Sequence, residues 1–232
     1  MLGAYTQLAD AYAAITPTKS WNAYYEWPAT RSLLPELAGK RVLDAGCGPG
    51  HYAKWMIEQG AQVVGIDLTP RMLELARAQL GKDVELHQAD LNEPLPFLND
   101  DSFDVVLSAL VCDYIRDWRR LFKEYHRVLR PGGAFVFSSQ HPMMEFVHHP
   151  VGSYFDTHYT SCKWRGFGEA IDMPYYQRSL SEMINSVLEA GFFLERVLEP
   201  LPTDDFRRVD PKDYEKLMNE PGFICFRARK PA

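Results

Sequence analysis

The chain has 232 residues, of which 46% are hydrophobic and 24% are charged. These fractions are those of a globular protein and exclude bulk disorder, and the length allows one large domain or two small ones. Asp and Glu outnumber Lys and Arg by 31 to 25, a net charge of −6. We therefore expect neither nucleic acid nor an anionic membrane as the main partner, because both attract a concentrated positive field.

No apolar run approaches the roughly 18 residues of a membrane-spanning segment. The first basic residue is Lys19, so the beginning of the chain lacks the charged start of a secretory signal. The four cysteines lie far apart and form no paired motif. Reduced, scattered thiols are typical of cytoplasmic proteins, and we predict that location. The histidines and cysteines lack a tight ligand spacing, so we expect no metal site.

Residues 1–40 look helical and tyrosine-rich, and we interpret them as an N-terminal cap. Strand-like and helix-like runs then alternate over 41–139, the predicted ligand-binding core. We predict strands over 41–45, 62–66, 84–87, 103–109 and 134–139. Helices are predicted between the first two strands, over 70–80, and over 118–129. This order is typical of a parallel sheet with helices on both faces.

Two segments follow the core. Residues 140–176 look irregular but contain eight aromatic residues in 37, whereas aromatic residues make up 13% of the whole chain. We interpret this segment as a lid inserted over an apolar or aromatic ligand, and the alternative is a structural insertion or a dimer contact. Residues 177–232 are predicted to form a helix that ends at Gly191 and two strands, over 192–198 and 223–229. We treat residues 1–232 as a single domain.

The sharpest local signal is the run from Val42 to Gly50, which joins the first strand to the first helix of the core. Its glycines let the backbone turn tightly and let a ligand approach it closely. A dinucleotide-binding loop has a third glycine where this chain has His51, and the lysine of a phosphate-binding loop is absent. Asp44 within the run would repel a phosphate and attract a cation. The loop therefore favours a ligand that carries an ammonium group.

Two more acidic residues follow the next strands of the core. Asp67 ends the second strand, where a carboxylate can accept hydrogen bonds from both hydroxyls of a ribose. Asp90 follows the third strand and could bind the amino group of an adenine. The carboxyl ends of parallel strands share one edge of the sheet, so we expect these acids to lie near Asp44. Each acid alone could equally be a helix cap or a turn residue.

Four blocks of this sequence resemble the class I S-adenosylmethionine-dependent methyltransferases, of the small-molecule methyltransferase 11-like type. The blocks are residues 42–50, 64–67, 88–91 with 95–97, and 129–133. The resemblance covers about residues 20–139. It implies a Rossmann-like α/β sheet of seven mostly parallel strands whose last strand, 223–229, is antiparallel. It also implies S-adenosylmethionine as the cofactor, S-adenosylhomocysteine as the product, and a small-molecule methyl acceptor.

The resemblance implies roles for individual residues. Asp44, Gly46 and Gly48 would surround the methionine moiety of the cofactor, and Asp67 would bind the ribose hydroxyls. Tyr25, in the N-terminal cap, is a further candidate contact.

Four other residues are implied around the adenine, and one around the amino group of the cofactor. Leu68 and Met72 would flank the adenine ring, and Asp90 and Leu91 would border its edge. The backbone carbonyl of Ala109, which ends the fourth strand, would accept a hydrogen bond from the cofactor's amino group.

The chemistry makes modest demands on catalytic residues. The sulfonium donor leaves as a neutral thioether, so the protein has to align the reacting atoms and exclude water. A general base is needed only when the nucleophile arrives protonated. His141 directly follows the fifth predicted strand, and we predict it as the base. A structural histidine is the alternative, and Asp113 and Tyr114 are lesser candidates for the base.

Two other functions fit the same sequence less closely. A non-catalytic S-adenosylmethionine-binding regulatory protein would keep the same loop and acids without turnover. A nicotinamide-dependent dehydrogenase is disfavoured by His51 and by the lack of residues suited to hydride transfer.

Overall fold

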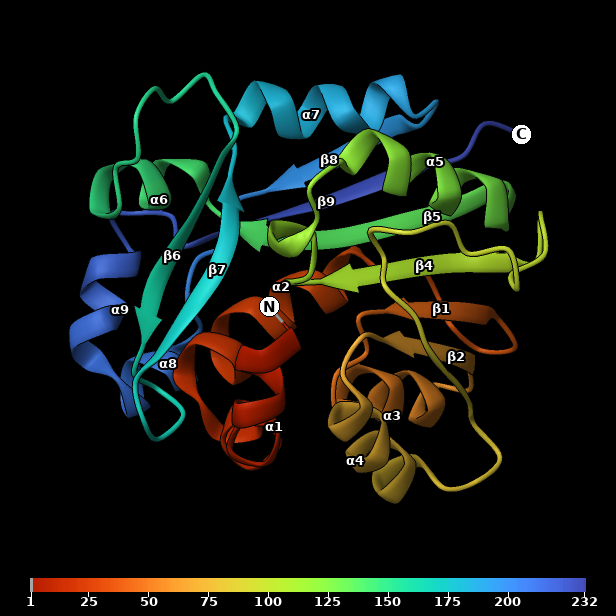
Figure 1. The fold of residues 1–232 in the computed structure, drawn as a ribbon, viewed down its shortest axis with the longest axis horizontal. Helices are drawn as coiled ribbons and strands as arrows, with labels where there is room; N and C mark the ends of the chain where they lie inside the picture. Colours follow the sequence, from red (N-terminus) through yellow and green to blue (C-terminus); the bar gives the residue numbers. More distant parts are fainter. Residues whose placement is uncertain (1) are drawn as a thin grey trace.

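A computed structural model describes residues 2–232. Seven strands form one sheet in the order β3-β2-β1-β4-β5-β9-β8 (Figure 1). Their bounds are Arg41–Ala45 (β1), Gln62–Asp67 (β2), Glu85–Gln88 (β3), Phe103–Ala109 (β4), Leu129–Gln140 (β5), Phe193–Leu198 (β8) and Phe223–Arg229 (β9). Strands β3, β2, β1, β4 and β5 pair in parallel, and β9 is antiparallel to both of its neighbours. The predicted Rossmann-like architecture is confirmed.

The helices precede, connect and follow these strands. Their bounds are Leu2–Ile15 (α1), Trp27–Leu33 (α2), His51–Glu58 (α3), Pro70–Leu80 (α4), Trp118–Val128 (α5), Pro142–His148 (α6), Leu180–Glu189 (α7), Asp204–Val209 (α8) and Pro211–Leu217 (α9). A π-helical turn over Asn22–Glu26 leads directly into α2. Within residues 2–232, no helix combines the length and the apolar character that crossing a membrane requires.

Apolar side chains cover both faces of the sheet. On one face, α5 and α7 bury Trp118, Phe122 and Val187 against the strands. On the other face, α2 and α3 bury Leu33 and Met56. The two helical layers explain why the central strands β1 and β4 are apolar on both sides, as parallel strands buried between helices generally are.

The segment 140–176 is more regular than its sequence indicates, and the prediction of irregular structure there is wrong. It contains α6 and an antiparallel hairpin of β6 (His158–Trp164) and β7 (Ile171–Gln177). The hairpin stands beside the main sheet, next to α1 and α6, and the arrowheads of β4 and β5 point toward this side of the molecule (Figure 1). Met173 and Tyr175 of β7 are buried with Leu8 of α1 and Tyr114, so tertiary packing holds the hairpin in place.

Candidate functional site

The glycine loop after β1 is held to the end of β2 by its own backbone. The N–H groups of Gly46 and Cys47 donate to the carbonyl of Ile66 at 2.7 and 2.8 Å. Gly46 has φ +84, and a Cβ added to it would lie 2.3 Å from Cγ2 of Val111. Only glycine satisfies both the left-handed backbone and the close approach of this neighbouring loop. Gly48 donates its N–H to Oδ2 of Asp67 at 2.9 Å.

The chain turns sharply after β4 at Leu110, which has φ +54 although it carries a side chain. Its N–H lies 3.1 Å from the carbonyl and 3.0 Å from the hydroxyl of Ser138 on β5. Strained backbone of this kind persists where the surrounding structure fixes it, and it is frequent at ligand sites. Three adjoining cavities lie at the carboxyl edge of the sheet, and Leu110 and Tyr12 line all three.

The first space, here called the rim cavity, lies between the glycine loop and the ends of β2, β3 and β4. Eight of the ten predicted cofactor contacts line it, namely Gly46, Gly48, Asp67, Leu68, Met72, Asp90, Leu91 and Ala109. Leu2, Tyr5 and Tyr12 of α1 close it, and its volume is about 90 Å³. Ligand pockets usually measure ~300–1,000 Å³, so this cavity is smaller than a typical one, and the side chains of α1 form the wall that closes it.

The acids at this edge also organise the backbone. Asp67 Oδ1 accepts a hydrogen bond from the N–H of Thr69 at 2.8 Å, and Asp90 Oδ1 accepts one from the N–H of Asn92 at 2.8 Å. Asp67 and Asp90 therefore act as turn residues and also line the rim cavity. Burial raises the pKa of Asp67, and the N–H groups of Thr69 and Gly48 oppose this effect.

The second space, the acid pocket, contains the remaining acid of the loop. Asp44 is 2% exposed, and its Oδ2 has no hydrogen-bond partner within residues 2–232. Burial and the charge of Asp67 raise the pKa of Asp44 to about 7. Glu26, which the sequence did not single out, lines the same pocket and accepts hydrogen bonds from Ser138 and Thr30, each at 2.6 Å. A buried carboxylate oxygen without a partner fits an incoming ammonium group, because a cation would supply the charge it lacks.

Two predicted residues lie elsewhere and line none of the three cavities. Tyr25 is 1% exposed; it packs against Phe206 and Phe223, and its hydroxyl accepts a hydrogen bond from the N–H of Gly222. His141 is the N-cap of α6: its Nδ1 accepts from the N–H of Met143 at 3.1 Å, and its Nε2 lies 2.8 Å from Glu199. Both side chains thus make structural contacts, and the cofactor contact of Tyr25 and the base role of His141 stay predictions.

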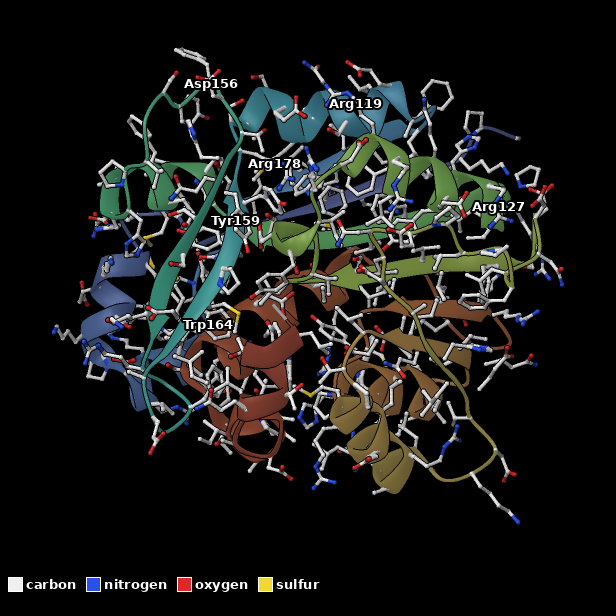
Figure 2. All side chains as sticks on the ribbon, viewed as in Figure 1. Arg119, Arg127, Asp156, Tyr159, Trp164 and Arg178 are labelled. Atoms are coloured by element: carbon white, nitrogen blue, oxygen red, sulfur yellow. The ribbon has the colours of Figure 1, made fainter. Side chains whose placement is uncertain are left out.

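The third and largest space, the aromatic cavity, has a volume of about 550 Å³. Its walls come from α1, the π-helical turn, the segment after β4, α6, the β6–β7 hairpin, α9 and the start of β9. They include Trp21, Trp164, Phe167 and Phe223. Trp164 is labelled in Figure 2 at the end of β6 that lies beside α1, and its ring centroid is 6.3 Å from that of Tyr5. Two of the eight aromatic residues of the segment 140–176, Trp164 and Phe167, line this cavity, and the lid stays a prediction.

Asp113 lines the aromatic cavity and is 4% exposed. Its Oδ1 accepts from the hydroxyl of Ser139 at 2.5 Å, and its Oδ2 accepts from the N–H of Gln140 at 3.2 Å. Burial raises the pKa of Asp113 to about 6, while these two donors lower it and the charge of Glu145 adds to the rise. A carboxylate with this pKa is ionised at neutral pH and can still accept a proton.

Helix α1 forms part of the wall of both the rim cavity and the aromatic cavity. The hydroxyls of Tyr5 and Tyr114 lie 2.8 Å apart, and both side chains line both cavities. Arg71 of α4 pairs with Asp10 at 2.6 Å, which ties α1 to the helix beside the rim cavity. In residues 2–232, no group of three or more His, Cys, Asp or Glu side chains is arranged to hold a metal ion.

Comparisons with known proteins agree with this geometry. A family model described as a methyltransferase domain matches residues 43–137. The solved structure of an S-adenosylmethionine-dependent methyltransferase from Mesorhizobium loti is 32% identical, covers 88% of this chain and 97% of that chain, and superposes with a TM-score of 0.71. An uncharacterized protein of Haemophilus influenzae is 30% identical over 91% of this chain and 89% of its own. A malonyl-[acyl-carrier protein] O-methyltransferase of Pseudescherichia vulneris is 35% identical over 57% of this chain, which corresponds to 53% of that enzyme.

Proposed function

The chain belongs to the S-adenosylmethionine-dependent methyltransferases, and we propose that it transfers the methyl group of this cofactor to a small molecule held in the aromatic cavity. The protein is an enzyme of this class, and S-adenosylmethionine is its cofactor. The observation that carries the proposal is that Leu110, Tyr12 and Tyr114 line both the rim cavity and the aromatic cavity. A cofactor in the first cavity and an acceptor in the second would meet at these residues.

The cofactor is proposed to bind with its amino acid end toward the acid pocket. Asp44 would face the ammonium group, because its Oδ2 is buried and lacks a partner. Gly46 and Gly48 would lie against the methionine chain, since both line the rim cavity and no side chain of Gly48 blocks the approach. The carbonyl of Ala109 would accept a hydrogen bond from the ammonium group.

The nucleoside end would occupy the rim cavity. Asp67 would bind the ribose hydroxyls with the carboxylate oxygen lone pairs that its backbone donors leave free. Leu68 and Met72 would flank the adenine, and Asp90 and Leu91 would border its edge, as the lining of this cavity supports.

The bound cofactor would supply an electrophilic methyl carbon whose leaving group is a neutral thioether. The residues of this chain would therefore align the reacting groups and exclude water. Tyr5 and Tyr12 of α1 close the rim cavity and would help to exclude water from it. Where the acceptor nucleophile carries a proton, Asp113 would take it, since this carboxylate lines the aromatic cavity. His141, predicted as the base, is proposed instead to hold the start of α6.

The acceptor is proposed to be apolar or aromatic, because aromatic side chains form most of the apolar wall of its cavity. Purified protein would be incubated with S-adenosylmethionine labelled on the methyl carbon and with pools of small aromatic and aliphatic nucleophiles. Release of S-adenosylhomocysteine together with a labelled product from at least one pool would support the proposal. Tight cofactor binding without turnover in any pool would favour a non-catalytic binding protein.

A further inference from the structure

The aromatic cavity contains charged groups of both signs, and three of its six basic residues contact an acidic side chain. Lys163 lies 3.1 Å from Asp172, and Lys216 lies 4.0 Å from Glu220. His148 lies 2.9 Å from the same Glu220. The neighbouring carboxylates offset the charge of these three groups, so the groups contribute little to the attraction of an anion.

Lys19 differs from these basic residues. It is partly buried in the wall of the cavity, and within residues 2–232 no carboxylate oxygen lies within 4 Å of its ammonium nitrogen. The ammonium stands 3.8 Å above the centre of the Phe167 ring, and a Cβ on Gly166 would come within 2.4 Å of it. The ring face attracts a cation but does not neutralise it. Burial lowers the pKa of Lys19, because no acid compensates for the water that the ammonium has lost.

Arg165 extends this positive region. It is exposed, immediately precedes Gly166 in the turn between β6 and β7, and lines the same cavity. No ion pair with Arg165 is formed in the described part of the chain. Two cations without acidic partners thus adjoin Gly166, at the end of the hairpin where Figure 2 labels Trp164.

Three carboxylates also line the cavity, and Oδ2 of one of them, Asp213, accepts a hydrogen bond from Nε1 of Trp21 at 2.7 Å. Glu145 contacts Gln177, the last residue of β7, so it lies toward the opposite end of that strand from the turn that contains Gly166. Asp113 and Glu145 are 4% and 7% exposed and both line the cavity. Repulsion from buried carboxylates would keep an anion away from them, whereas a hydroxyl, thiol or amine could lie beside Asp113. The charges of the cavity therefore give an acceptor a direction, with any anionic group toward Gly166 and its nucleophile toward Asp113.

We propose that the methyl acceptor carries an anionic group, a carboxylate or a phosphate, which Lys19 binds in the aromatic cavity with the support of Arg165. The proposal rests on the proposed function, because it concerns the acceptor of that same reaction. It adds the substrate class, an aromatic or apolar acid whose nucleophile lies away from its charged end.

The test measures the binding of unreactive probes to the full-length protein saturated with S-adenosylhomocysteine. Calorimetric titrations would compare 2-naphthoate and 2-naphthyl phosphate with the neutral 2-naphthamide. We expect one of the two anions to bind at least about tenfold more tightly than the amide, as a charged hydrogen bond to an ammonium group permits. The anion that gains this preference identifies the group that the acceptor carries.

Three variants assign the preference to Lys19. In Lys19→Met we expect the preference to fall to about threefold or less, and in Lys19→Arg we expect it to remain largely intact. Lys212→Met is the matched control, because Lys212 is exposed at the start of α9 and lines none of the three cavities. The thermal midpoint and the affinity for S-adenosylhomocysteine of each variant would show that it is folded.

Equal affinity of the wild type for the anions and the amide would overturn the inference, as would a preference that persists in Lys19→Met. Absence of binding by all three probes to the saturated protein would overturn it as well. Failure of the wild type to bind S-adenosylhomocysteine would instead contradict the proposed function, and that titration is carried out first.

Discussion

The N–H of Gly48 donates to the carboxylate of Asp67 at 2.9 Å, so the acid that ends β2 also fixes the shape of the glycine loop that follows β1. Gly48 follows β1 and Asp67 ends β2, and these neighbouring parallel strands are paired in register up to Ala45 and Ile66. One carboxylate thereby links the part of the site expected to bind the ribose with the part expected to bind the methionine chain. Loss of this carboxylate should affect both.

Asp67→Ala should weaken the binding of S-adenosylhomocysteine by about tenfold to a hundredfold. The change removes a charged hydrogen-bond acceptor for the ligand, which is worth about 1.5–3 kcal/mol, and it also releases the Gly48 N–H. Calorimetry with the purified variant would measure the loss. Asp83→Ala is the control, because Asp83 is exposed and lines none of the three cavities, and its affinity should equal that of the wild type. An unchanged affinity in Asp67→Ala would exclude this carboxylate from the site.

Gly46→Ala tests the close approach of the loop after β4. A methyl group at Gly46 would overlap the Val111 side chain, and the residue would also have to keep φ +84. Gly81→Ala separates the two effects, because Gly81 has the same φ and open space around it. We expect Gly81→Ala to cost only the backbone strain, ~1–3 kcal/mol, and Gly46→Ala to cost more and to abolish ligand binding.

Urea unfolding of both variants would measure these costs, and the double variant Gly46→Ala with Val111→Ala should recover part of the difference. Equal costs in the two single variants would show that the overlap with Val111 is unimportant.

The core of the fold could be predicted from the sequence because its signals are local. The apolar strand at 41–45, the glycine run after it and the acids at 67 and 90 lie within short windows. A parallel sheet then brings the ends of these strands to one edge without further information. This is why eight predicted residues surround one cavity.

The β6–β7 hairpin could not be predicted in the same way. Its strands alternate weakly between apolar and polar residues, β7 contains Pro174, and six residues separate them. A proline within a strand usually argues against that strand. The hairpin is held by Met173 and Tyr175 packing against α1, and this contact joins parts of the chain more than 150 residues apart.

Tyr25 and His141 lie outside the three cavities for related reasons. Tyr25 is buried by Phe206 and Phe223, which come from the far end of the chain, so its position depends on contacts that no local pattern contains. His141 does lie at the end of β5, as predicted. Pro142 after it begins α6, however, and the imidazole caps that helix. Proline is frequent at the first position of a helix, so Pro142 in the sequence indicates that His141 is the capping residue before it.

Asp44 should make the stability of the ligand-free protein depend on pH. Its folded pKa, about 7, lies above its ordinary value of 3.8. A group with a raised folded pKa contributes stability that is fully present below the unfolded pKa and is lost as the pH rises through the folded pKa. Each pKa unit corresponds to about 1.4 kcal/mol, so ionised Asp44 should cost a few kcal/mol at pH 8.

Asp44→Asn should therefore gain stability relative to the wild type as the pH is raised from 4 to 8. Urea unfolding of both proteins at several pH values would measure the difference, which also includes the effect of the Asp44 charge on the pKa of Asp67. Saturation with S-adenosylhomocysteine should reduce it, since the ammonium group of the ligand stabilises the ionised carboxylate. A difference that is independent of pH would show that Asp44 is ionised in the fold throughout this range.

The identity of the general base can be decided between Asp113 and His141 once an acceptor with a protonated nucleophile is in hand. Asp113 lines the aromatic cavity, whereas Nδ1 of His141 caps the start of α6 and its Nε2 contacts Glu199. Asp113→Asn keeps the size of the side chain but cannot take a proton, and general base catalysis typically contributes ~10²–10⁴-fold. We expect turnover to fall by about that factor while the affinity for S-adenosylhomocysteine stays within about twofold.

The pH profile adds a second readout of the same assignment. Because the pKa of Asp113 is raised to about 6, kcat/KM of the wild type should decline below pH 6 as this carboxylate becomes protonated, and Asp113→Asn should lose that decline. His141→Asn is the matched variant, since asparagine can still cap α6 but is not a base. We expect it to retain most of the turnover; a loss as large as that of Asp113→Asn, in a folded protein that still binds the ligand, would assign the base to His141 instead.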